Sequence, residues 1–216
     1  VDLPESYNGL GIRNLLMILF QIVGFYRRFR AHPQAPIVQL IFIEEPEAHL
    51  HPQMQEVFIR QLSEIAKRLR GDDPALWPVQ FVVSTHSSHI ANETPFSKIR
   101  YFIAGSKGKP LGVRCTTIKD LGRGLSSLTG TSAAFLHQYL TLTRCDLFFA
   151  DKAILIEGTT ERIFVPEILR KLDTERIKAG ARQEIRSQYI TLLEVGGAYA
   201  YMFQPLLDFL ELKTLI

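Results

Sequence analysis

Residues 40–52 read LIFIEEPEAHLHP, and this stretch decides the fold class of the chain. Residues 37–43 are almost continuously apolar, which is typical of a parallel strand covered on both faces. Two acids follow directly, and Pro52 suits the first turn of a helix whose apolar positions repeat at helical spacing up to residue 69. A second buried strand is expected over residues 79–83. This strand–helix–strand order predicts an α/β fold with a mainly parallel sheet.

The paired acids Glu44 and Glu45 come at the carboxyl end of the buried strand, where open α/β sheets bind ligands. The first acid can hold Mg²⁺, and the second can orient or deprotonate an attacking water. After the next strand, residues 84–89 read STHSSH, and His86 can reach the same edge to donate to a γ-phosphate. Adjacent acids alone could equally be solvated turn residues. A histidine one βαβ unit later favours a nucleotide-hydrolysis site.

A second pair of acids follows a later strand. Glu157 directly follows the apolar stretch 153–156, which is expected to form a strand. Glu161 falls in the first turn of the helix expected over residues 160–172. Two carboxylates placed in this way can converge on a divalent ion, since Mg²⁺ prefers oxygen ligands. The alternative for Glu161 is that it only complements the helix dipole.

The other predicted elements complete the alternation of helices and strands. We expect three regions: residues 1–121, a linker with a bridging helix over 122–145, and residues 146–216. The further elements are a helix over 10–30, a hairpin of strands 99–104 and 113–118, a helix over 133–143, a strand over 189–195, a helix over 198–210 and a strand that begins at 213.

The first group of motifs resembles the ATP-binding-cassette (ABC) ATPases, and within them the overcoming-lysogenization-defect (OLD) nuclease family. The resemblance implies that Glu44 is the Mg²⁺-side acid, Glu45 the catalytic base and His86 the γ-phosphate sensor. It places His49 and His51 at a dimer seam.

The segment SYNGLG at residues 6–11 resembles a divergent signature motif of this ATPase class. Such a motif engages the ATP held by a partner subunit, through backbone amides at a helix N-terminus. The alternative is a plain helix start with flexible glycines. The residues that the resemblance assigns to nucleotide binding here are Ser6, Asn8, Gly9 and Gly11.

Residues 151–161 resemble the opening of a Toprim domain, the metal-binding fold shared by topoisomerases, primases and OLD nucleases. On this resemblance Glu157 is a catalytic residue, and Glu157 and Glu161 bind metal. The implied architecture is the C-terminal part of an ABC-type ATPase domain followed by the N-terminal half of a Toprim domain, both with mainly parallel sheets.

The resemblance implies an ATP-dependent DNA endonuclease in which a cassette ATPase dimer controls a two-metal nuclease. Its cofactors would be ATP and Mg²⁺ or Mn²⁺, and its substrate DNA. It further implies a homodimer or higher homo-oligomer in the cytoplasm with no membrane association, and a role in bacterial antiphage defence or DNA processing. It also allows a helicase-like partner protein.

Two motifs of that family do not occur in the chain: a GxxxxGK[ST] phosphate loop and a DxD pair after the last strand. The chain also begins with Val1. We therefore expect an internal piece of a longer protein, inactive by itself. Two alternatives stay open, a non-nucleolytic cassette ATPase that acts as a DNA-repair or chromosome-maintenance clamp, and a primase or topoisomerase relative.

Composition narrows the function classes further. At 216 residues, 46% hydrophobic and 22% charged, the chain can form a real core. Cys115 and Cys145 lack metal-ligand spacing, which excludes zinc fingers. The net charge of +3 permits a nucleic-acid partner without demanding one. Basic clusters at 27–30, 67–70 and 170–186 could hold phosphates, although solvated helix faces explain them more simply. The most apolar run, residues 15–23, is too short to span a bilayer.

Overall fold

The computed structural model describes residues 9–34, 36–105, 115–125, 146–196 and 199–216. The chain divides into two compact units, Val1–Thr94 and Pro95–Ile216, and each is described by itself. The predicted boundaries at residues 121 and 145 stay predictions. The helix expected over residues 133–143 and most of the expected linker lie outside the described residues.

The first unit is built on two parallel strands that end at the same edge. Strands β1 (Gln39–Glu44) and β2 (Val79–Ser84) pair in parallel, with Glu44 opposite Ser84. The helices of this unit are α1 (Leu10–Ala31), α2 (Pro52–Arg70) and α3 (Ser88–Asn92), with a 3₁₀ turn η2 at Pro74–Leu76. The predicted order of helix, strand, helix and strand over residues 10–83 is confirmed, and the short helix α3 was not predicted.

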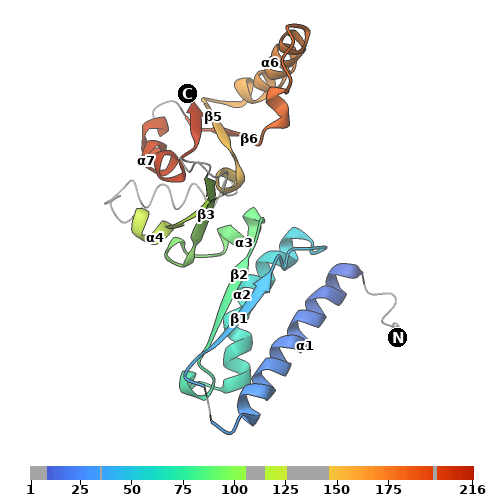
Figure 1. The fold of residues 1–216 in the computed structure, drawn as a ribbon, viewed down its shortest axis with the longest axis vertical. Helices are drawn as coiled ribbons and strands as arrows, with labels where there is room; N and C mark the ends of the chain where they lie inside the picture. Colours follow the sequence, from blue (N-terminus) through green and yellow to red (C-terminus); the bar gives the residue numbers. More distant parts are fainter. Residues whose placement is uncertain (1–8, 35, 106–114, 126–145, 197–198) are drawn as a thin grey trace. The chain divides into compact units, whose positions relative to one another are not determined.

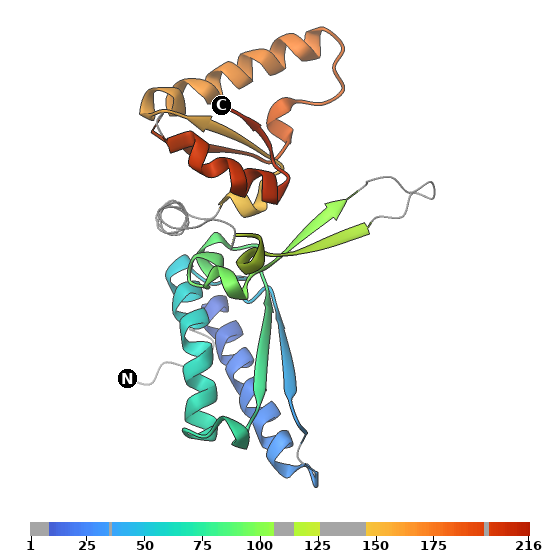
Figure 2. The same ribbon diagram turned by 90° about the vertical axis from the view of Figure 1, so that its left-hand side faces the viewer.

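Both long helices of this unit pack on one side of the strand pair (Figure 2). The buried core joins Ile22 of α1, Ile41 and Ile43 of β1, Phe58 of α2 and Trp77. No described element of this unit covers the other face of the strands, and Phe42 is 68% exposed. The prediction of a strand covered on both faces is therefore wrong for this structure, because no described element lies over the second face.

The length of helix α1 differs from the expectation that the most apolar stretch is too short to span a bilayer. With 22 residues and a mean hydropathy of 1.2, it is long and apolar enough to cross a membrane by length and composition alone. The expectation considered only the uninterrupted run at residues 15–23. Length and composition of one helix are weak evidence for a membrane span, and two residues of α1, Ile22 and Phe29, are buried in the core of the first unit.

The second unit contains a three-stranded parallel sheet in the order β6–β5–β7. Its elements follow one another as in a doubly wound fold, so the carboxyl ends of all three strands lie at one edge (Figure 1). The elements are β5 (Lys152–Ile156), α6 (Thr159–Lys178), η5 (Ile185–Ser187), β6 (Ile190–Glu194), α7 (Ala200–Leu210) and β7 (Lys213–Leu215), preceded by η4 (Asp146–Phe149).

An antiparallel hairpin also belongs to the second unit. It consists of β3 (Arg100–Gly105) and β4 (Cys115–Asp120), framed by η3 (Phe96–Lys98) and α4 (Leu121–Gly124). Lys119 donates to the carbonyl of Phe209 at the end of α7 and forms an ion pair with Glu211 at 2.9 Å. Gly124 approaches the Phe209 ring so closely that a Cβ there would overlap it. The predicted hairpin is confirmed, and it packs against the last helix of the second unit.

Candidate functional site

The predicted acids of the first unit lie at the carboxyl edge of β1 and β2. Glu44 is the last residue of β1, and the Glu45 amide donates to the carbonyl of Ser84 at 3.0 Å. Glu45 has a left-handed backbone, with φ of 42°. Residues other than glycine adopt this conformation at a cost and persist in it when the surrounding structure holds them, which is common at active sites.

Glu45 and His86 come together as the sequence predicted. Their side chains are 61% and 81% exposed, and Nε2 of His86 lies 3.5 Å from Oε1 of Glu45. A pair this exposed contributes little to the stability of the fold. Its placement beside Glu44, at the edge where parallel sheets bind ligands, suits a reaction on a bound molecule.

The loop that carries His86 is fastened by side chains of the first unit. Glu47 accepts a hydrogen bond from the His86 amide at 2.6 Å, and the Ser87 hydroxyl donates to Gln55 of α2 at 2.5 Å. Further along, Nδ1 of His89 lies 3.0 Å from a carboxylate oxygen of Glu56. The sequence reasoning assigned no role to Glu47, Gln55 or Glu56. The one signal for Glu47 was its place inside the acidic motif.

The predicted signature segment is only partly described. Ser6 and Asn8 lie outside the described residues, and Gly9 is the N-cap of α1 without a side-chain cap. A Cβ at Gly11 would lie 2.2 Å from the carbonyl oxygen of His49. Gly11 is therefore required for close packing of α1 on the turn after β1. The packing of α1 therefore explains the glycine at position 11 without any contact to a nucleotide.

A second contact holds the same turn against α1. The side-chain amide of Asn14 donates to the carbonyl of Ala48 at 3.1 Å. His49 has a left-handed backbone with φ of 66°, and both His49 and His51 are exposed. Their predicted place at a dimer seam stays a prediction.

The acids of the second unit gather at the edge of its own sheet. Glu157 follows β5 and is exposed, while Glu194 ends β6 as the register partner of Ile156. Glu161 accepts from the Gly158 amide at 3.1 Å, which is the role of an acid that starts a helix. The Thr159 hydroxyl donates to Glu194 at 3.3 Å.

Carboxylate donors of this kind fit Mg²⁺ or Mn²⁺. Within the described part of the chain, no group of three or more histidine, cysteine or acidic side chains is close enough to hold a metal ion. Glu157, Glu161 and Glu194 share one edge without forming a complete site. Glu194 was missed by the sequence reasoning, although its position at the end of the neighbouring strand was a usable signal.

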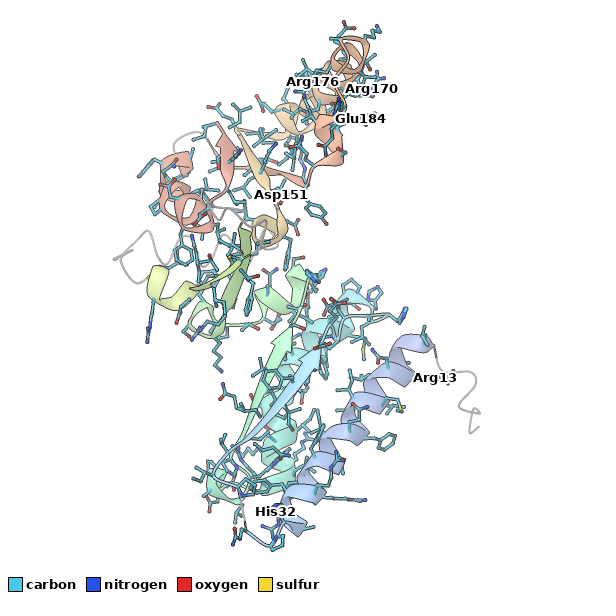
Figure 3. All side chains as sticks on the ribbon, viewed as in Figure 1. Arg13, His32, Asp151, Arg170, Arg176 and Glu184 are labelled. Carbon is cyan, nitrogen blue, oxygen red and sulfur yellow. The ribbon has the colours of Figure 1, made fainter. Side chains whose placement is uncertain are left out.

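Several basic residues of the stretch 170–186 pair with nearby acids. Arg170 hydrogen-bonds to Glu167 and holds the pKa of that carboxylate below its ordinary value. Lys178 pairs with Glu175 at 3.2 Å. Figure 3 shows Arg170 and Arg176 on α6 and Glu184 on the segment that follows it. These local pairs favour the solvated-face interpretation over a phosphate-binding patch.

Comparison with known proteins identifies both units. Residues 1–91 match the family described as AAA ATPase domain, and residues 148–216 match the family described as overcoming lysogenization defect protein-like, TOPRIM domain. The resemblance to the OLD family is confirmed. The mixed α/β fold with mainly parallel sheets agrees with this ATPase and OLD-like TOPRIM arrangement.

Two curated relatives align with the chain. "Endonuclease GajA" of Bacillus cereus (strain HuB5-5) is 28% identical over 223 residues, which cover 100% of this chain and 31% of the relative. "OLD nuclease" of Thermus scotoductus (strain ATCC 700910 / SA-01) is 28% identical over 176 residues, which cover 81% of this chain and 30% of the relative. The chain thus spans about a third of the length of these relatives.

Proposed function

We propose that this chain acts within an ATP-dependent, metal-dependent DNA endonuclease in which an ABC-type ATPase controls a Toprim nuclease. The observation that carries the proposal is the presence of two separate acidic sheet edges. Glu44, Glu45 and His86 lie at one, and Glu157, Glu161 and Glu194 lie at the other. The names of the two relatives, an endonuclease and an OLD nuclease, support the same reaction class.

At the first edge, Glu45 is assigned the role of general base toward the water that attacks ATP. Its carboxylate is exposed and therefore open to solvent. His86 extends from the end of the neighbouring strand to the same place and would donate to the γ-phosphate. Glu44 would hold Mg²⁺, which neutralises charge that develops on the phosphates. Gly9 and Gly11, with Ser6 and Asn8, are proposed to meet the ATP of a partner subunit.

At the second edge, Glu157 is assigned to the nuclease. Its exposed carboxylate follows the middle strand of the sheet, with Glu161 one helical turn further along the chain. Both are proposed ligands of Mg²⁺ or Mn²⁺, which would supply charge stabilisation for phosphodiester cleavage. In this structure Glu161 also fixes the start of α6 through the Gly158 amide, so it orients the same edge.

The wider biological setting is proposed on the family resemblance. It comprises a homodimer or higher homo-oligomer, DNA as substrate, a cytoplasmic location, a helicase-like partner and a role in antiphage defence or DNA processing. The TOPRIM match over residues 148–216 favours the nuclease over a non-nucleolytic clamp, because a clamp has no use for a metal-binding nuclease fold.

The test is to separate the two activities in one full-length protein. We expect Glu157→Ala to eliminate Mg²⁺- or Mn²⁺-dependent DNA cleavage and to leave ATP turnover intact, because Glu157 belongs to a sheet that does not contain Glu44 and Glu45. Glu175→Ala, which removes an exposed acid of α6, is the matched control. Cleavage retained by a folded Glu157→Ala variant would show that this edge is not the nuclease site.

A further inference from the structure

Glu47 links the turn after β1 to the loop after β2. It lies two positions after Glu45, and its Oε1 accepts a hydrogen bond from the His86 amide at 2.6 Å. Its Oε2 is buried and has no hydrogen-bond partner among the described residues. One oxygen of this carboxylate therefore binds the loop, and the other is withdrawn from solvent.

A half-buried acid with one buried, unmatched oxygen does not improve the stability of a fold. Leaving a buried acceptor without a donor costs about 1–3 kcal/mol, and more when it is charged. In return, a hydrogen bond to an ionised acceptor is roughly twice as strong as a neutral one. The buried Oε2 of Glu47 thus lowers the stability of the fold, while its Oε1 forms a strong hydrogen bond with the backbone of His86.

The position of Glu47 argues against a role as a third metal-binding acid. Glu44 and Glu45 are exposed at the sheet edge, whereas Oε2 of Glu47 is buried and Oε1 is occupied by the His86 amide. A metal ligand needs an oxygen that faces the ion. What Glu47 can do is fix a neighbouring residue.

The other side-chain contacts of the loop after β2 are made by residues that follow His86. Gln55 holds the Ser87 hydroxyl, and Glu56 holds the His89 ring, and both acceptors belong to α2. Glu47 instead comes from the turn that also carries Glu45. Its hydrogen bond therefore connects the turn that carries the proposed general base to the backbone of His86.

We propose that Glu47 is a positioning residue for ATP hydrolysis, which holds the His86 loop against the turn after β1 so that the imidazole stays beside Glu45. The inference rests on the proposed ATPase function. Glu47 acts through His86 and touches neither the nucleotide nor the attacking water. Displacing a catalytic group by about 1 Å can cost about 100-fold in rate, so losing this bond has a measurable effect.

The experiment is a double-mutant cycle in the full-length protein, with Glu47→Ala, His86→Ala and the double variant. We expect each single variant to lower kcat for ATP hydrolysis by about 10- to 100-fold with little change in KM. We expect the double variant to be no slower than His86→Ala alone, because Glu47 acts only through that residue. Glu64→Ala, which removes an exposed acid of α2, is the matched control and should hydrolyse ATP normally.

A second variant, Glu47→Gln, tests whether an acceptor at position 47 is what turnover requires. It keeps an acceptor oxygen for the His86 amide, so it should recover part of the turnover lost in Glu47→Ala. If Glu47→Ala melts below the assay temperature, Glu47→Leu, which fills similar space but cannot accept the bond, replaces it in the cycle with the same expectation for the double variant.

Two outcomes would overturn the inference: normal turnover in a folded variant that lacks the acceptor at position 47, or losses that multiply in the double variant. Failure of the proposed function has a different signature. In that case Glu45→Gln turns over ATP normally, or the wild-type protein does not hydrolyse ATP, whatever the result for Glu47.

Discussion

Glu45 has an exposed carboxylate at the end of a core strand and contacts His86 across a gap of 3.5 Å. We expect Glu45→Gln in the full-length protein to lower ATP turnover by about 10²–10⁴-fold, because glutamine cannot accept the proton of the attacking water. ATP should still bind, since the change removes neither a backbone contact nor the β1–β2 pairing. Steady-state turnover and equilibrium ATP binding measure the two effects.

The matched control for this change is Glu64→Gln, which alters an exposed acid on α2 that pairs only weakly with Arg68 at 3.4 Å. Near-normal turnover in Glu45→Gln would remove Glu45 from the role of base.

Asp173 is a buried acid outside either candidate site, with a side chain that is 3% exposed. Burial alone would raise its pKa. Hydrogen bonds from the Ile185 and Arg186 amides and from the Arg186 guanidinium outweigh burial and hold the pKa of Asp173 below its ordinary value. The carboxylate therefore fastens η5 to α6 most strongly while it is ionised.

A depressed pKa fixes the direction of the pH effect. The stabilisation by Asp173 is fully present above the unfolded-state pKa of about 3.9 and is lost as the pH falls through the lower folded-state value. We expect Asp173→Asn to speed amide exchange at Ile185 and Arg186 at pH 7, and the difference from wild type to shrink at pH 3. Hydrogen exchange compared at each pH measures it, with Glu175→Gln as the control. An equal difference at both pH values would contradict this assignment.

At the scale of elements, the packing of α1 on the turn after β1 depends on a missing side chain. Because a Cβ at Gly11 would lie 2.2 Å from a backbone oxygen, Gly11→Ala must displace either the helix or the turn. We expect a loss of about 1–3 kcal/mol in stability, as for other overpacked sites, together with lower ATP turnover. Melting temperature and turnover of the full-length protein measure both.

Gly24→Ala is the matched control, since nothing lies within 4 Å of a Cβ added there and alanine favours a helix. If Gly11→Ala lost turnover without any loss of stability, the packing explanation would fail and a direct nucleotide contact would remain.

The elements themselves were the part of the structure that the sequence predicted well. Residues 37–43 and 153–156 are short apolar runs that end in acids, and such runs are recognisable without tertiary information. The convergence of Glu45 and His86 followed from parallel pairing, which brings the ends of successive strands to one edge.

The rest depended on contacts between residues distant in sequence. No local pattern distinguishes Glu47, which binds a backbone amide 39 positions away, from a solvated turn acid. The sequence could assign Gly11 to a signature-like segment. It could not show that the carbonyl of His49 leaves no room for a side chain there. The uncovered face of β1 was missed because an apolar run does not reveal whether one side or both sides are covered.

At the scale of the whole molecule, the proposed signature segment has a use only if a second subunit supplies the nucleotide. We expect the full-length protein to form a homodimer that ATP stabilises, most clearly in the Glu45→Gln variant, which should bind ATP and hydrolyse it slowly. Sedimentation with and without ATP measures this. A protein that stays monomeric in both conditions and still hydrolyses ATP normally would contradict the dimer.

The left-handed backbone at Glu45 and His49 has a consequence for engineering. Glycine adopts this conformation without the penalty of roughly 1–2 kcal/mol that other residues incur. A library selected for thermal resistance alone would therefore enrich glycine at both positions and discard the acid assigned to catalysis. Variants recovered from such a selection need a parallel screen for turnover, because one of the two residues it replaces is the one on which the proposed chemistry depends.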